Sequence, residues 1–175
     1  MTKPKTLNCH HGVLMNINDH GVFIIGQAGI GKSSFALELL HLGHQLIADD
    51  VVEFKRNDNV ITGSCPQMSA GFLHSRELGL IAITQVFSLE AFIQQHTLDY
   101  IIELKPSIEN TSDLSPSLSH EILGINLPLL QLSINSPASL YHRLLTWLTI
   151  QSTDYMAEQD LKKRQQRQMN IDQNN

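Results

Sequence analysis

Short apolar runs alternate with polar turn residues in the first part of the chain. Residues 13–17 and 22–25 are two such runs, each of the length of a strand. Between them lies Asn-Asp-His-Gly at residues 18–21, a composition that is typical of a tight turn. We therefore predict a β-hairpin whose second strand leads into the glycine-rich segment that begins at Gly26.

The next segment, residues 34–42, has the periodicity of a helix that faces a core. Phe35, Leu39 and Leu42 recur at the i, i+4 and i+7 spacing that places side chains on one helical face. Gly43 follows directly, and glycine is the residue most often found where a helix ends. A strand, a glycine-rich loop and a helix are thus predicted in that order.

The same patterns predict the main elements of the rest of the chain. Further strands are expected at residues 45–48, 51–55, 60–63, 98–104 and 127–134. The second and third of these flank Arg-Asn-Asp-Asn at residues 56–59, which predicts a second hairpin. Ser139 is a suitable N-cap for a helix over residues 140–153.

Four segments show no clear periodicity of apolar residues. Residues 64–79 mix Pro, Gly, Ser and Met and are predicted to be an irregular loop. The secondary structure of residues 80–92 is ambiguous, and a helix is favoured in the second half of this segment. Residues 106–120 are rich in Ser, Asn, Pro and Asp, and we expect a polar and mobile loop there. Residues 159–175 are rich in Gln, Lys and Arg, which predicts a frayed helix or disorder with a solvated face.

Composition limits the class of protein. A chain of 175 residues with 42% hydrophobic and 17% charged residues suits one globular domain, and a net charge of −5 argues against nucleic acid as a partner. The two cysteines have neither metal nor redox spacing, which fits a reducing cytoplasm. No apolar run reaches membrane-spanning length, so no membrane partner is expected. We expect an arm at 1–8, a main domain at 9–155 and a tail at 156–175.

The glycine-rich segment carries the strongest chemical signal. It matches G-x-x-x-x-G-K-S, a phosphate-binding loop, and the predicted binding residues are Gly26, Gln27, Ala28, Gly29, Ile30, Gly31, Lys32, Ser33 and Ser34. Backbone N–H groups of such a loop point at phosphate oxygens, Lys32 would reach the β- and γ-phosphates, and the Ser33 hydroxyl would bind Mg²⁺. A chance match in a glycine-containing turn is the alternative, and the flanking strand and helix argue against it.

Two further features lie close to this loop in the sequence. Asp49 and Asp50 end the predicted strand after the helix, where a carboxylate usually handles magnesium or the nucleophile. Adjacent carboxylates on a strand end point in different directions, so one could face the metal while the other accepts a proton. A simple turn or cap pair is the alternative. His11 precedes the first predicted strand and could contact phosphate or tune an Asp, or be an ordinary exposed histidine.

Together these residues resemble the catalytic domain of the HPr kinase/phosphorylase family. The resemblance covers residues 11–141 and is carried by segments 11–14, 26–33, 36–39, 43–50, 76–81 and 121–128. In the last two, Arg-Glu-Leu-Gly-Leu-Ile resembles the family's R-G-L-G-I-I, and Glu-Ile-Leu-Gly-Ile-Asn-Leu-Pro resembles its E-I-L-G-V-x-V-P. The separate N-terminal domain of the family has no counterpart in this chain.

The resemblance implies a fold, an activity and an assembly. The fold would be α/β, similar to PEP carboxykinase, with a mixed sheet and hairpin additions. The cofactors would be ATP and Mg²⁺, the partner the phosphocarrier protein HPr, and the assembly a hexamer. Catalytic residues would be His11, Lys32 and Asp50, with Asp49 beside them. Asp50 would be the general base when a seryl hydroxyl attacks the γ-phosphate, and the general acid when inorganic phosphate removes phosphoserine to give pyrophosphate.

The chain departs from the family pattern at positions that matter for transfer. His74 stands where the family has a Mg²⁺-binding Glu, and Glu77 is the nearest carboxylate that could replace it. The family's catalytic Arg has no counterpart around residues 112–115, because no Arg occurs between Arg76 and Arg143. Another expected Arg is replaced near Ile93. A nucleotide-binding regulatory module with weakened catalysis is therefore the second hypothesis, and a kinase of another small substrate is the third.

Overall fold

The computed structural model describes residues 8–108, 118–153 and 157–172. The chain divides into two compact units, Met1–Pro137 and Ala138–Asn175. Among the described residues, the second unit consists of α3 (Leu140–Ser152) and α4 (Ala157–Asp172). The first unit holds the strands and the shorter helices, and the predicted phosphate loop lies within it.

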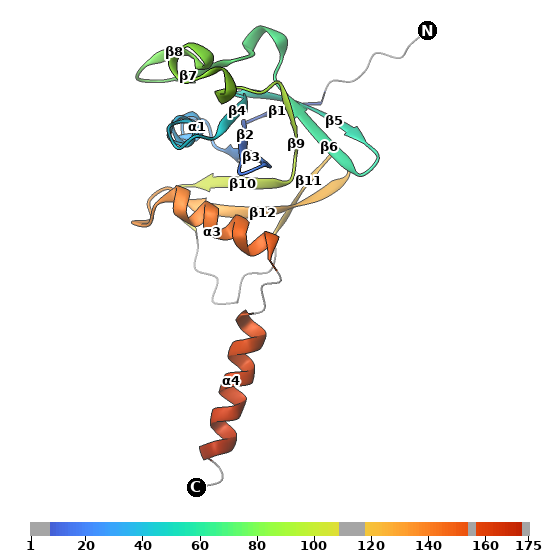
Figure 1. Ribbon diagram of the computed structural model, residues 1–175, viewed down its shortest axis with the longest axis vertical. Helices are drawn as coiled ribbons and strands as arrows, with labels where there is room; N and C mark the ends of the chain where they lie inside the picture. Colours follow the sequence, from blue (N-terminus) through green and yellow to red (C-terminus); the bar gives the residue numbers. More distant parts are fainter. Residues whose placement is uncertain (1–7, 109–117, 154–156, 173–175) are drawn as a thin grey trace. The chain divides into compact units, whose positions relative to one another are not determined.

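The first unit is built from three sheets and a few short helices (Figure 1). Its strands are β1 (Asn8–His11), β2 (Val13–Ile17), β3 (His20–Gly26), β4 (Gln45–Ala48), β5 (Val51–Asn57), β6 (Val60–Ser64), β7 (Phe72–Ser75), β8 (Gly79–Ala82), β9 (Gln95–Thr97), β10 (Tyr100–Lys105), β11 (Ser119–Ile122) and β12 (Ile125–Ser133). Its helices are α1 (Lys32–His41), α2 (Ile83–Val86) and the 3₁₀ turns η1 (Gln67–Ser69) and η2 (Leu89–Ala91).

The largest sheet has six strands in the order β11-β12-β10-β3-β2-β4. Strand β3 runs parallel to β10 and antiparallel to β2, and β4 is in turn antiparallel to β2. Strand β4 therefore runs in the same direction as β3, and the two strands end at the same edge of the sheet. This topology brings Gly26, which ends β3, and Asp49, which follows β4, to one place.

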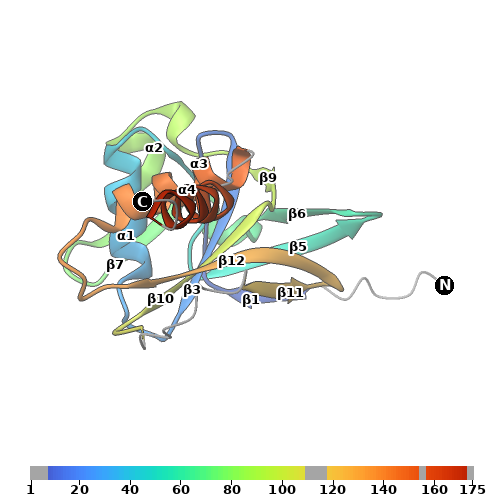
Figure 2. The ribbon, with the colours of Figure 1, turned by 90° about the horizontal axis from the view of Figure 1, so that it is seen from below.

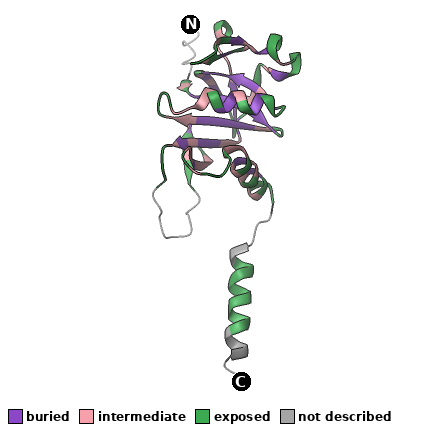
Figure 3. Ribbon diagram, turned by 90° about the vertical axis from the view of Figure 1, so that its left-hand side faces the viewer, coloured by how far each residue is buried: buried purple, intermediate pink, exposed green. Residues whose placement is uncertain are grey.

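A buried layer lies between the six-stranded sheet and the four-stranded sheet β1-β5-β6-β9. Leu14 and Phe23 of the first sheet join Val52, Phe54 and Ile61 of the second in one apolar cluster. The rings of Phe23 and Phe54 meet edge to face, with 5.0 Å between their centroids. Figure 3 shows the buried residues concentrated in the central strands, and Figure 2 shows the β5–β6 hairpin extending away from the end where α1 and α2 lie.

Helix α1 packs on the other face of the large sheet. Alternate residues of a strand point to opposite faces, so Met15 and Ile24 face away from the cluster that holds Leu14 and Phe23. Helix α1 contacts β2, β3 and β4 and buries Phe35, Ala36, Leu39 and Leu40. The helix that follows the phosphate loop is thus fixed by an apolar face, which holds the loop in place.

Much of the predicted secondary structure is confirmed. The strands at residues 13–17 and 45–48 have the predicted bounds, both predicted hairpins form, and the helix over residues 34–42 corresponds to α1. The strands at 98–104 and 127–134 correspond to β10 and β12, shifted by one or two residues at each end. Helix α3 begins after Ser139, whose side-chain oxygen accepts a hydrogen bond from the His142 N–H. The α/β architecture with a mixed sheet is also confirmed.

Several predictions need correction. Residues 64–79 are not one irregular loop, because β7 pairs with β8 as an antiparallel hairpin within and beyond that range. The α-helix predicted for the second half of 80–92 lies in the first half as α2, and η2 follows it. Asn8, assigned to the arm, begins strand β1, whereas residues 1–7 lie outside the described part.

The two polar segments are only partly described. In the predicted loop at 106–120, residues 109–117 lie outside the described part, and β11 begins at Ser119. The described part of the tail is helical, as α4. Among the described residues, no helix combines the length and the hydropathy that a membrane crossing requires.

Candidate active site

The phosphate loop connects the end of β3 to the start of α1. Gly26, Gly29 and Gly31 have φ angles of 146°, 80° and 107°, a backbone conformation that side chains with a Cβ rarely adopt. The glycines therefore allow the tight path that the loop takes between strand and helix. The loop leads into the N-terminus of α1, where unpaired N–H groups and the helix dipole favour an anion.

Lys32 folds back over the loop that precedes it. Its ammonium group donates hydrogen bonds to the carbonyl oxygens of Gly26 and Gln27, at 3.0 and 3.1 Å. These bonds hold a positive charge directly above the loop. A phosphate group in the loop would offer charged oxygens to the same ammonium group, and such hydrogen bonds are stronger than those to a neutral carbonyl.

Asp49 connects the phosphate-loop helix to the β7–β8 hairpin. Its carboxylate accepts a hydrogen bond from the Ser33 hydroxyl at 2.9 Å and another from the backbone N–H of His74 at 2.8 Å. Only 6% of Asp49 is exposed. A buried carboxylate with two donors fixes the position of Ser33, the residue predicted to bind the metal.

Asp50 has a different environment from that of its neighbour. Its backbone is left-handed, with φ of 68°, and its carbonyl oxygen accepts a hydrogen bond from the Gly12 N–H at 3.1 Å. The carboxylate is exposed and lies 3.8 Å from Nδ1 of His11. Asp49 and Asp50 thus point in different directions, and the carboxylate of Asp50 is open to a group that approaches from solvent.

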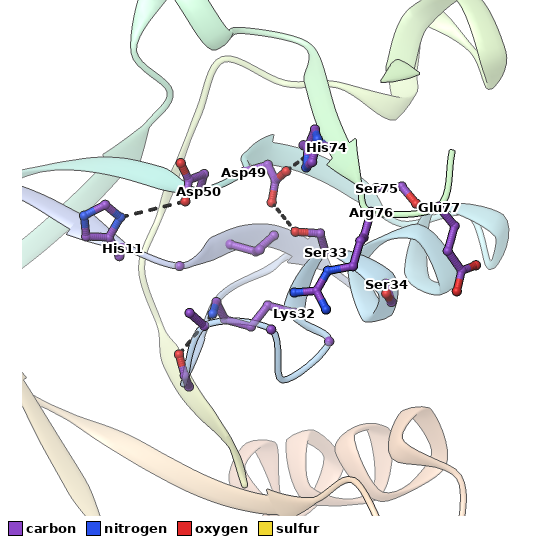
Figure 4. A pocket seen from close by; sticks show the side chains of 16 residues that line it. His11, Lys32, Ser33, Ser34, Asp49, Asp50, His74, Ser75, Arg76 and Glu77 are labelled. Carbon is purple, nitrogen blue, oxygen red and sulfur yellow. Dashed lines mark hydrogen bonds and ion pairs between the residues drawn. The ribbon is translucent and has the colours of Figure 1, made fainter. Parts of the chain in front are cut away.

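One pocket of about 540 Å³ gathers these groups (Figure 4). It is lined by His11, Gly12, Val13, Gly26, Ala28, Gly29, Gly31, Lys32, Ser33, Ser34, Asp49, Asp50, His74, Ser75, Arg76 and Glu77. Two of the predicted loop residues, Gln27 and Ile30, shape the turn through a backbone hydrogen bond of 3.2 Å and are not among the lining residues. An anion-binding loop and an exposed carboxylate facing one pocket are the groups that phosphoryl transfer to a hydroxyl requires.

Arg76 lines this pocket although the sequence patterns assign it no role. A Cβ placed on Gly29 would lie 3.0 Å from Nη2 of Arg76, so the guanidinium lies against the loop. Figure 4 shows it extending from the β7–β8 hairpin toward the loop. Guanidinium groups bind phosphate oxygens in a bidentate manner, so a second cation is available beside Lys32. In the sequence, the sign that Arg76 could belong to the site is its position in segment 76–81, which resembles the family.

His74 and Glu77 both line the pocket but differ in direction. His74 lies beside Asp49, to which its backbone is bonded, and its side chain is exposed. Glu77 lies further along the hairpin, and Figure 4 shows its carboxylate pointing away from Ser33. In this arrangement Asp49, rather than Glu77, is the carboxylate that is next to the predicted metal ligand.

The residues around Ser33 fit a magnesium ion. Mg²⁺ prefers hard oxygen ligands and is usually held by one or two carboxylates, nucleotide phosphates and waters. The Ser33 hydroxyl and the Asp49 carboxylate supply two such oxygens within 2.9 Å of each other. Among the described residues, no group of three or more His, Cys, Asp or Glu is placed to hold a metal by itself. A metal at this site would therefore depend on bound phosphates.

Comparisons with known proteins point to one family. The model of the HPr Serine kinase C-terminal domain matches residues 5–165. The HPr kinase/phosphorylase of Clostridium novyi is 36% identical over 127 residues, and that of Aromatoleum aromaticum is 39% identical over 120 residues. These alignments cover 73% and 66% of this chain.

The chain spans about four tenths of the length of these two relatives, 39% and 38%. A solved structure gives a fuller match. The Hpr(Ser) kinase/phosphatase from Coxiella burnetii is 33% identical, with a TM-score of 0.75, and the match covers 83% of this chain and 98% of that one. The chain therefore belongs to the family of the HPr serine kinase C-terminal domain.

Proposed function

We propose that the protein is an ATP-dependent serine kinase/phosphorylase that acts on the phosphocarrier protein HPr. The observation that carries this proposal is the arrangement of the pocket, where a phosphate loop with Lys32 and Ser33 faces the exposed carboxylate of Asp50. Membership of the family and the names of the relatives, HPr kinase/phosphorylase, support the choice of reaction and substrate.

The phosphate loop would bind the β- and γ-phosphates of ATP. Its backbone N–H groups, the Lys32 ammonium and the Arg76 guanidinium would then neutralise charge around the transferred group. The nearness of Arg76 to Gly29 supports its part in this binding. Because the family Arg expected near residues 112–115 has no counterpart in the sequence, Arg76 would be a main source of positive charge in addition to Lys32.

Asp50 would accept the proton of the attacking seryl hydroxyl. Its exposure suits this role, because the substrate is a side chain of another protein and must reach the carboxylate from outside. His11, whose Nδ1 lies 3.8 Å from Asp50, would orient that carboxylate or contact the phosphoryl group. In the reverse reaction, Asp50 would return the proton to the seryl oxygen as inorganic phosphate takes the phosphoryl group and forms pyrophosphate.

Magnesium, held by Ser33 with Asp49 beside it, would neutralise charge on the phosphate oxygens. Asp49 would also keep Ser33 in place through the 2.9 Å hydrogen bond. His74 occupies a position where the family has a carboxylate, so we infer that this chain needs more Mg²⁺ than a relative with that carboxylate.

The proposal extends to assembly and location. We infer a hexamer from the family resemblance, with a protein substrate that docks on the assembled ring. The two cysteines, Cys9 and Cys65, are free thiols. Free thiols suit the reducing cytoplasm, where we place the reaction.

Transfer to HPr tests this function. The protein is incubated with γ-labelled ATP, Mg²⁺ and HPr, and label on a serine of HPr is the expected result. Lys32→Ala serves as the matched control and should give none. If ATP binds but no label reaches HPr under any metal condition, the regulatory module without catalysis is the better account. If neither ATP binding nor transfer occurs, the phosphate-loop interpretation itself is wrong.

A further inference from the structure

The backbone at Asp50 forms a turn of an uncommon kind. The Val51 N–H donates a hydrogen bond to the Asp49 carbonyl oxygen at 2.9 Å, so the bond spans a single residue, Asp50. Asp50 has a φ of 68°. A bond between residues i and i+2 across a positive φ is the rare and strained form of the γ-turn. Such a conformation persists only where the surrounding structure imposes it.

The end of β1 holds this turn in place. His11, the last residue of β1, pairs with Val51, the first residue of β5. The next residue, Gly12, donates its backbone N–H to the Asp50 carbonyl oxygen at 3.1 Å. The side chain of Asp50 is 84% exposed, so packing of the carboxylate does little to fix it. The direction of the carboxylate, shown in Figure 4, therefore depends on how the backbone of the turn is held.

The position of Gly12 has no room for a side chain. Gly12 is buried, and it is not among the residues with a positive φ, so space rather than conformational freedom requires glycine here. A Cβ on Gly12 would overlap Cε2 of Phe23 and lie 2.7 Å from the carbonyl oxygen of Ile24. Neither neighbour can move easily. The Phe23 ring is 1% exposed and packs edge to face on Phe54, and the Ile24 carbonyl belongs to the backbone of β3.

We propose that Gly12 is a positioning residue for phosphoryl transfer and acts through the turn at Asp50. The absence of a side chain lets the chain cross beside β3, and the Gly12 N–H then fixes the carbonyl of Asp50. This inference rests on the proposed function, in which the Asp50 carboxylate accepts the seryl proton. A side chain on Gly12 would displace the N–H and, with it, the turn that aims the carboxylate. A shift of about 1 Å in a reacting group can lower a rate about a hundredfold.

Gly12→Ala, compared with Gly63→Ala, tests the proposal. Gly63 is also buried, and a Cβ there would overlap Cδ2 of Leu14 and lie 2.8 Å from Cε1 of Phe54, but Gly63 does not line the phosphate-loop pocket. Both variants should lose stability. At a temperature where both are folded, Gly12→Ala should lower kcat for transfer to HPr about ten- to a hundredfold, with ATP affinity within about twofold of the parent. Gly63→Ala should keep the kcat of the parent. Equal kcat values in the two variants would overturn the proposal.

A double-mutant cycle shows whether Gly12 acts through Asp50. In the Asp50→Asn background, where the base is already lost, Gly12→Ala should slow the residual transfer by less than about twofold. The same factor in both backgrounds would mean that Gly12 affects transfer by another route, and the proposal would be wrong.

Hydrogen exchange, followed by mass spectrometry, tests the contact without any activity. Peptides that cover residues 49–53 should exchange faster in Gly12→Ala than in the parent, and at the parent rate in Gly63→Ala. Unchanged exchange of these peptides in Gly12→Ala would overturn the proposal. If Gly12→Ala fails to fold, the exchange of the Gly12 amide in the parent decides: slow exchange supports the hydrogen bond to Asp50, and fast exchange contradicts it. A parent that gives no transfer to HPr would refute the proposed function, and these exchange rates would still show whether Gly12 holds the turn.

Discussion

Replacing Asp49 by Asn should destabilise the fold, whereas the same change at Asp50 should not. Asp49 is 6% exposed and accepts hydrogen bonds from the Ser33 hydroxyl and the His74 N–H. In Asp49→Asn, the new Oδ1 can accept from the His74 N–H while the new Nδ2 donates to the Ser33 oxygen. Both bonds therefore persist, but each loses its charged acceptor.

The size of the stability loss follows from the replacement of a charged hydrogen-bond partner by a neutral one in two hydrogen bonds. A hydrogen bond to a charged group contributes about 1.5–3 kcal/mol to stability and a neutral one about 0.5–1.5 kcal/mol. Two such exchanges would cost about 2–3 kcal/mol. Part of this loss is offset, because the neutral amide of Asn removes the cost of burying an ionised carboxylate. We expect a loss of about 2 kcal/mol in the free energy of unfolding. Asp49→Ala should lose more, because it leaves the His74 N–H without an acceptor.

Urea unfolding of the parent and of both Asn variants measures the difference. The midpoint for Asp49→Asn should fall at an unchanged slope, and Tm should drop by about 4–8 °C. Asp50→Asn should stay within about 0.5 kcal/mol of the parent, since its side chain is exposed and Asn tolerates a φ of 68°. Equal stability of the two variants would show that Asp49 does not link Ser33 to the β7–β8 hairpin.

Three further predictions concern the proposed activity. Lys32→Ala should weaken ATP binding and abolish transfer. An unchanged ATP affinity of this variant, measured by calorimetry, would contradict the interpretation of residues 26–33 as a phosphate-binding loop. His74→Glu should lower the Mg²⁺ concentration needed for transfer, because a carboxylate suits that ion better than imidazole; Mn²⁺ should serve the parent relatively well. An identical metal dependence in parent and variant would mean that His74 does not face the metal. Light scattering at micromolar concentration should give a hexamer, and a monomer would contradict the assembly.

The sequence predicts those parts of the site that are marked by a motif or by apolar spacing within one short segment. The phosphate loop shows itself through glycines, Lys32 and Ser33, and the flanking strand and helix follow from apolar spacing. Asp49 and Asp50 could be placed beside the loop because they end the next strand after its helix. The structure confirms that placement, since β4 and β3 end at the same edge of the sheet.

Other parts have no such signal. Strand β1 is an edge strand with mostly exposed polar residues, so its pattern does not distinguish it from an arm. The β7–β8 hairpin escaped prediction because its apolar residues lie on both faces. Phe72 and Leu80 are exposed, whereas Leu73 and Ile81 are buried, so apolar character does not follow a strand period. The contact of Arg76 with the loop at Gly29 joins residues 47 positions apart in the printed sequence and appears only in the folded chain.

The rate of phosphoryl transfer to HPr in Asp50→Asn, measured beside the parent at equal ATP occupancy, tests the central claim most directly. Asp50 would be the general base, and such a base typically contributes about 10²–10⁴-fold. We therefore predict that Asp50→Asn binds ATP nearly as the parent does, while label on the HPr serine appears at least about a hundredfold more slowly. Parent-like transfer by Asp50→Asn would contradict the account.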